Sequence, residues 1–162
     1  MNTLLQSSVF IHILAACIWI GGSIFLAAIF VPMRRHETLS KHAYALFGPA
    51  ARRFRNIGWI CLVLLVVTGF LNIHARGISF HDSAFWKSDM GHLIMIKVTV
   101  VLVIVALSIY HDLVAGPRAV AARQEDPQGA TYQKYRKQAS WIGRVNLLLS
   151  LVVLWIAVDL FH

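Results

Sequence analysis

Four long apolar segments, separated by polar connections, dominate the sequence. They cover about residues 5–33, 57–73, 92–113 and 141–161. A helix of about 20 mostly apolar residues crosses the roughly 30 Å hydrocarbon core of a bilayer, and a helix satisfies its own backbone hydrogen bonds there. The pattern therefore predicts an all-α integral membrane protein, a four-helix antiparallel bundle that forms a single domain over residues 1–162.

Prolines and polar stretches indicate where the predicted helices end. Pro32 and Pro117 stand at the ends of the first and third apolar segments, where the missing proline N–H is tolerated. A polar stretch that contains a Pro and a Gly follows Pro117 and includes RQEDPQGATYQKYRKQ. We expect this stretch to be a surface loop with a short amphipathic helix.

Small and polar residues at helical spacing indicate which face of each helix meets its neighbours. In lipid, such residues favour helix–helix contact because they allow close approach and hydrogen bonding. The four faces together predict a bundle with a polar-lined centre. They comprise Ser8, His12, Ala15, Ala16, Trp19, Gly22 and Ser23, then Gly58, Cys61, Thr68, Gly69 and Asn72, then Lys97, Ser108, His111 and Asp112, and finally Gly143, Asn146 and Ser150.

Basic residues are concentrated in the first and third connections, and this asymmetry predicts the orientation. Connections rich in Lys and Arg face the cytoplasm, so both termini are expected on the periplasmic side of a bacterial inner membrane. The chain carries a net charge of +8, yet 58% of its residues are hydrophobic and only 14% are charged. The lipid bilayer, with its anionic headgroups, therefore explains the basic residues, and no nucleic acid partner is expected.

Ionisable residues in the apolar segments are the candidate functional groups, because they are costly in lipid and usually functional. His12, about one turn inside the first segment, is either a metal or haem ligand or a neutral histidine bonded to a neighbouring helix. Lys97 either contacts a haem propionate or a quinone, or extends to the interface. His74 and His92, at segment ends, are further candidate ligands or ordinary interfacial histidines.

His111 and Asp112 form a second ionisable group toward the predicted cytoplasmic end. Adjacent residues of a regular helix diverge by about 100°, so we do not expect these two to pair with each other. A structural role with Arg118 or Arg144 is favoured instead.

Sulfur ligands offer little support for a copper-specific site. Cu(I) prefers thiolate and thioether ligands, but Cys17 and Cys61 are isolated in apolar segments, and Met33, Met90 and Met95 form no regular ladder. Phosphate-binding loops, nucleophile elbows and paired carboxylates are absent from the sequence. Whether the protein is an enzyme is left open.

The longer motifs resemble a known family. They are FIHILAACIWIGGSIFLAAIFVP (Phe10–Pro32), RFRNIGWICLVLLVVTGFLNI (Arg53–Ile73), GHLIMIKVTVVLVIVALSIYHDLVAGPR (Gly91–Arg118) and WIGRVNLLLSLVV (Trp141–Val153). Together these segments resemble the CopD-like (copper-resistance D) membrane domain over nearly the whole chain. The resemblance implies a four-helix unit associated with copper uptake or copper homeostasis.

A more distant similarity is to the four-helix protoporphyrinogen oxidase family of the haem pathway. That family has a histidine early in its first helix and a lysine in its third. His12 and Lys97 stand at the matching positions.

Three hypotheses follow for the function. The first is a redox or electron-transfer membrane protein that binds haem b in the manner of a cytochrome b, with His12 as one axial ligand, His74 or His92 as the other, and Lys97 beside a propionate or quinone. The second is copper uptake or homeostasis, with a copper ion bound by the same histidines. The third is an accessory subunit of a respiratory complex. The expected partners are a quinone, a periplasmic redox or copper protein, a second copy of the chain or a larger membrane complex.

Overall fold

The computed structural model describes residues 3–33, 37–75, 77 and 83–159, and every regular element in these ranges is a helix. The predicted all-α class is confirmed. The chain divides into two compact units, residues 1–85 and 86–162, each of which is described by itself. Large apolar side chains are exposed on both units, for example Phe10 at 66%, Phe70 at 66% and Trp155 at 70%. Such surfaces are suited to lipid.

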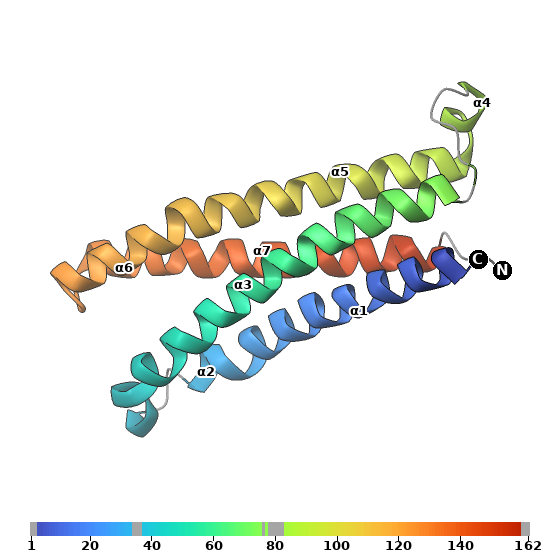
Figure 1. The fold of residues 1–162 in the computed structure, drawn as a ribbon. Helices are drawn as coiled ribbons and strands as arrows, with labels where there is room; N and C mark the ends of the chain where they lie inside the picture. The colour runs from blue at the N-terminus through green and yellow to red at the C-terminus, as the bar shows by residue number, and fades with distance from the viewer. Residues whose placement is uncertain (1–2, 34–36, 76, 78–82, 160–162) are drawn as a thin grey trace. The chain divides into compact units, whose positions relative to one another are not determined.

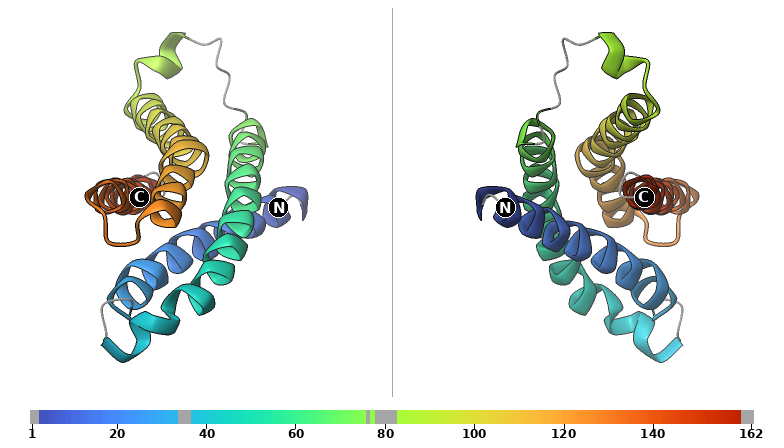
Figure 2. Two further views of the ribbon diagram at one scale, coloured as in Figure 1. Left: turned by 90° about the vertical axis from the view of Figure 1, so that its left-hand side faces the viewer. Right: turned by 90° about the vertical axis from the view of Figure 1, so that its right-hand side faces the viewer.

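Unit 1 is a hairpin of two long helices (Figure 1). It consists of α1 (Thr3–Phe25), a π-helical turn η1 (Leu26–Phe30), α2 (Val31–Met33) and α3 (Glu37–Ala75). A short helix, α4 (Ser83–Trp86), lies at the junction with unit 2. In Figures 1 and 2, α1 and α3 lie side by side and run in opposite directions.

Unit 2 is a second antiparallel hairpin. One arm is continuous through α5 (Asp89–Tyr110), the π-helical turn η2 (His111–Ala115) and α6 (Gly116–Glu125), and the other arm is α7 (Ala130–Asp159). The N-terminus of α5 is capped by the hydroxyl of Ser88, which accepts a hydrogen bond from the Gly91 N–H at 3.1 Å. This side-chain cap satisfies a backbone donor that the helix itself leaves without a partner.

Four helices in the described part of the chain are long and apolar enough to cross a membrane, and each is longer than the apolar segment that predicted it. Helices able to cross a membrane cover Thr3–Met33, Gly48–Ala75, Asp89–Glu125 and Ala130–Asp159. The third comprises 37 residues, which at 1.5 Å per residue is about 55 Å and exceeds the hydrocarbon core. Part of this arm therefore extends beyond the apolar layer.

The polar stretch predicted to be a surface loop with a short amphipathic helix is mostly helical, so a helix is present as predicted and the loop is shorter than predicted. Only residues 126–129 separate α6 from α7. The two helices pack against each other, and Ala122 on α6 and Tyr132 on α7 are buried at 6% and 8% exposure. Ala, Gln and Arg, all good helix formers, are frequent in this stretch. The contact with the partner helix adds burial that the polar composition did not indicate.

Each of the two π-helical turns ends two residues before a proline. The Val31 N–H bonds to the Leu26 carbonyl and the Gly116 N–H bonds to the His111 carbonyl, and Pro32 and Pro117 come next. A proline ring clashes with the carbonyl four residues earlier in a regular α-helix, and a wider turn relieves that clash. The helical arm therefore continues past Pro117, contrary to the prediction that it ends there.

Glycines opposite aromatic rings bring α1 and α3 together. The Phe54 ring occupies the space that a Cβ on Gly22 would need, and the Trp19 ring lies 2.8 Å from a Cβ placed on Gly58. Farther along the two helices, toward His12, Ala15 and Cys61 are buried at 2% and 3% exposure. The predicted contact face of small residues is confirmed for this pair of helices.

The contact between α5 and α7 agrees only in part with the predicted faces. Ser108 and Ser150 are buried as expected, and Ile104 and Ile156 are buried with them. Gly143 is exposed and no atom lies within 4 Å of a Cβ placed on it. The predicted faces refer to the whole bundle, and Gly143 takes no part in the contact within this hairpin.

Candidate functional site

His12 lies in the seam between α1 and α3, where a threonine orients its ring. Its Nδ1 is 2.7 Å from Oγ1 of Thr68, and that hydroxyl donates its one hydrogen to the Leu64 carbonyl at 2.5 Å. The Thr68 oxygen must therefore accept a hydrogen bond from His12, and Nδ1 carries the proton. In a neutral imidazole the lone pair is then on Nε2, the usual arrangement for a metal-binding histidine whose other nitrogen donates to a neighbour.

The backbone of α3 lies close to the edge of the imidazole ring. A Cβ placed on Gly69 would be 3.7 Å from Cε1 of His12, an ordinary van der Waals distance. Thr68 itself is 4% exposed. The hydrogen bond to Thr68 and the nearby backbone of α3 together give the ring a defined orientation.

Two buried oxygens without hydrogen-bond partners lie one turn from His12. Ser8 precedes His12 by four residues and Asn72 follows Thr68 by four residues, so in the antiparallel pair both lie toward the same end of the seam. Within the described part of the chain, Ser8 Oγ and Asn72 Oδ1 have no hydrogen-bond partner, and Ser8 is only 9% exposed. A buried polar group left unsatisfied costs about 1–3 kcal/mol, so the pair calls for a ligand or a water molecule.

The group defined by Ser8, His12, Thr68 and Asn72, here called the seam site, offers one imidazole nitrogen and neutral oxygens. Sulfur is distant, since Cys61 lies seven residues before Thr68 along α3, about 10 Å away at 1.5 Å per residue. Among the described residues, no three His, Cys, Asp or Glu side chains form a group that could hold a metal ion. The donor set fits a borderline or hard cation better than a soft one.

His74 lies on a different face of α3 from the seam site. It follows Thr68 by six residues, a net rotation of about 240° at 3.6 residues per turn. Its side chain is exposed and lines an apolar surface groove with Val66, Val67, Phe70 and Leu71. The structure thus does not bring His74 to the side of α3 that contacts His12.

The other two predicted site residues belong to unit 2. His92 is exposed in the first turn of α5, and Lys97 is half-buried farther along the same helix. Because each unit is described by itself, a pairing of His12 with His92 or Lys97 stays a prediction.

His111 and Asp112 do pair, contrary to the prediction from regular helical spacing. Nδ1 of His111 is 2.9 Å from Oδ1 of Asp112. The pair lies at the start of the π-helical turn η2, where the wider turn changes the angular spacing that a regular α-helix would impose. The contact between His111 and Asp112 forms without Arg118 or Arg144, which were the expected partners.

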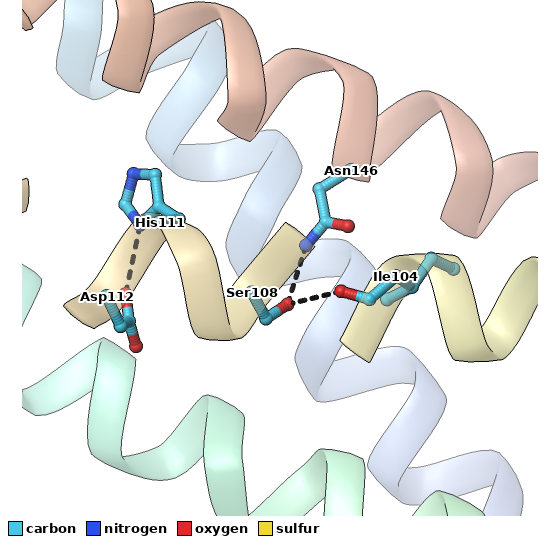
Figure 3. A network of polar contacts seen from close by, with 5 residues as sticks. All are labelled: Ile104, Ser108, His111, Asp112 and Asn146. Atoms are coloured by element: carbon cyan, nitrogen blue, oxygen red, sulfur yellow. Dashed lines mark hydrogen bonds and ion pairs between the residues drawn. The ribbon is translucent and has the colours of Figure 1, made fainter. Parts of the chain in front are cut away.

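A polar network joins α5 to α7 next to this pair, as Figure 3 shows. The Asn146 amide donates to Oγ of Ser108 at 2.9 Å, and that hydroxyl donates to the Ile104 carbonyl at 2.8 Å. The predicted contact residues Ser108 and Asn146 thus meet across the hairpin. Interhelical hydrogen bonds of this kind stabilise membrane helices by roughly 0.6–2 kcal/mol.

The sequence analysis identified His12 but assigned no site role to the residues around it. The missed members are Ser8, Thr68 and Asn72, although all three were placed on the contact faces. A signal was present in the spacing, because Ser8 and His12, like Thr68 and Asn72, are four residues apart and so share a helix face.

Comparisons with known proteins give two matches. The family model for copper resistance protein D matches residues 48–160. A protein of Aquifex aeolicus (strain VF5), named only as an uncharacterized protein, is 30% identical over 150 residues, which is 92% of this chain and 90% of the relative. No solved structure matches the chain.

Proposed function

The chain belongs to the copper resistance protein D family, and from this premise we propose that it serves copper uptake or homeostasis, with His12 as an imidazole ligand for copper. Copper is the cargo in this proposal, so the site has to release the ion as well as receive it. We place both termini, and the end of the seam that holds Ser8 and Asn72, on the outer side of a bacterial inner membrane. Copper arriving from outside would then meet these residues first.

The observation that carries the proposal is the hydrogen bond between His12 and Thr68. It directs the proton to Nδ1, so Nε2 is the nitrogen through which a neutral His12 would bind a metal. Imidazole is a good ligand for copper. The two buried oxygens one turn away supply further donor atoms that have no hydrogen-bond partner among the described residues. The imidazole and these oxygens are the donor atoms that support copper as the ligand in this proposal.

Haem b fits the surroundings of His12 less well. Ala15, whose small size would allow a macrocycle to approach α1, is 2% exposed because α3 packs on this face. His74, one of the two candidates for a second axial ligand, lies on another face of α3. Copper is therefore the preferred ligand, and haem is treated as an alternative outcome of the experiment.

The test measures copper in cells that express the protein. We expect cell-associated copper to rise on expression of the native chain and to return to the level of an empty vector for His12→Asn. Asparagine keeps an amide donor for Thr68 but lacks Nε2, so the variant isolates the metal ligand. His74→Asn is the matched control, and we expect it to behave like the native protein at equal membrane abundance.

Two results would contradict the proposal. One is a copper content that does not respond to expression of the native chain, and the other is a His12→Asn variant indistinguishable from it. A Soret band in the purified protein that His12→Asn abolishes would identify haem as the ligand instead.

A further inference from the structure

We propose that unit 2 binds the phosphate groups of anionic phospholipids where its two arms leave the apolar layer. The residues that carry this binding are Arg118 on α6 and Arg136 and Lys137 on α7, here called the basic collar. The proposal concerns the hairpin of unit 2 alone, and it is independent of the seam site and of copper.

Two exposed apolar side chains mark where the arms of this hairpin leave the hydrocarbon. Leu113 is 72% exposed and Trp141 is 64% exposed, and each stands at the end of an apolar segment of the sequence. Such side chains are suited to contact with lipid, and tryptophan favours the membrane–water interface. Residues 116–125 and 130–140, which pack side by side as α6 and the start of α7, therefore project beyond the hydrocarbon (Figure 1).

The basic collar lies at the depth of the lipid phosphates. Arg118 is five residues beyond Leu113, which is about 7 Å at 1.5 Å per residue. Arg136 and Lys137 precede Trp141 by five and four residues, or about 6–8 Å. The headgroup layer on each side of the hydrocarbon is about 5–8 Å thick. Arg118 and Lys137 are also at the same level, since each is eight residues from the connection between α6 and α7.

The charges of this projection are arranged by depth. All three residues of the basic collar are exposed, and within the described ranges none of them forms an ion pair with a carboxylate. The acidic residues Glu125 and Asp126 lie at the tip, about 18 Å beyond Leu113. An acidic protein docked along the projection would meet these carboxylates, whereas phosphates at the bilayer surface meet only the cations. The arrangement therefore favours lipid over a soluble acidic partner.

The side chains of the basic collar match the chemistry of a phosphodiester. A guanidinium group can donate two parallel hydrogen bonds to phosphate oxygens, and a lysine adds a compact positive charge. Each basic residue close to an anionic membrane surface strengthens the attraction by about 5-fold. Phosphatidylcholine carries the same phosphate together with a cationic ammonium group, which the collar repels. We therefore expect selection of a net anionic lipid such as phosphatidylglycerol.

The test counts lipids retained by the purified full-length protein in a neutral detergent, by native mass spectrometry. Phosphatidylglycerol and phosphatidylcholine with identical acyl chains are titrated separately. We expect the native protein to prefer phosphatidylglycerol, and the double variant Arg118→Gln with Lys137→Gln to bind it about 10-fold more weakly. The arginines of α3 are unchanged in every variant, so the difference between proteins reports the collar.

The matched control is Arg123→Gln with Lys134→Gln. It also removes one arginine from α6 and one lysine from α7, but these residues lie about one turn farther from the phosphates than their counterparts in the collar. We expect it to lose less than about 3-fold in affinity. Thermal unfolding without added lipid checks the fold of both variants. Should a double variant not fold, single Lys137→Gln and Lys134→Gln, which change exposed side chains, give the same comparison.

Three results would overturn the proposal. They are equal affinities of the native protein for the two lipids, equal losses in the collar variant and its control, and displacement of phosphatidylglycerol by soluble polyglutamate that depends on Arg123 and Lys134. The last result would identify an acidic protein as the partner. A loss of phosphatidylglycerol confined to the folded collar variant supports the proposal.

Discussion

At the scale of single residues, one hydrogen bond decides which nitrogen of His12 can meet a metal. The Thr68 hydroxyl has a single hydrogen, which the Leu64 carbonyl takes, so the hydroxyl can serve His12 only as an acceptor. The same logic applies to His111, whose Nδ1 lies beside the Asp112 carboxylate. In both cases a neighbour on the protein selects the tautomer of the imidazole.

Replacement of Thr68 tests this role. We expect Thr68→Val to weaken copper binding by about 10-fold or more, because the valine keeps the shape of the side chain but cannot accept the Nδ1–H bond. Thr68→Ser retains the hydroxyl, and its affinity should stay close to that of the native protein. Titration of the purified variants measures the difference, and equal affinities for the Val and Ser variants would show that the hydrogen bond does not orient the ligand.

At the scale of the elements, glycines set how closely α1 approaches α3. Gly22 and Gly58 each face an aromatic ring of the partner helix, Phe54 and Trp19 respectively. In lipid there is no hydrophobic driving force between helices, so close packing of this kind supplies much of the attraction. The register that brings His12 to Thr68 depends on these contacts.

A pair of adjacent glycines allows a controlled test of that packing. Gly22→Ala places a methyl group where the Phe54 ring lies and should destabilise the protein by about 1–3 kcal/mol. Gly21→Ala changes the neighbouring residue, where nothing lies within 4 Å, and should be neutral or slightly stabilising because alanine favours helix. Thermal unfolding in a mild detergent compares them, at about 2–4 °C for each kcal/mol. Equal midpoints would show that the Phe54 contact does not hold the hairpin together.

At the scale of the whole molecule, four membrane-crossing helices require both termini to lie on one side of the bilayer. The basic residues of the first and third connections predict that this side is the periplasm. The direction of copper movement in the proposed function depends on this orientation, because it decides which end of the seam site first meets the ion.

Reporter fusions at the C-terminus test the orientation. We expect a C-terminal alkaline phosphatase fusion to be active, since that enzyme requires the oxidising periplasm for its disulfides, and a C-terminal green fluorescent protein fusion to be dark. The reverse pattern would place both termini in the cytoplasm, and copper would then meet His12 from inside the cell.

The sequence by itself determined the helical class, the four spans and the residues of the α1–α3 contact face. These are local properties, because the length of an apolar segment and the spacing of its small residues are visible in that segment alone, without knowledge of the helix it packs against. Even so, the prediction from regular helical spacing was wrong for the pairing of His111 with Asp112. A π-helical turn near Pro117 alters the helical spacing there.

Only the tertiary structure decided the composition of the seam site. Thr68 is 56 residues from His12 along the chain, and whether two such residues meet depends on the register in which two helices pack. The unpartnered oxygens of Ser8 and Asn72 follow from that same register. The sequence pattern indicates which residues share a face of one helix. It does not indicate how two helices align, because close packing against a particular partner sets that alignment.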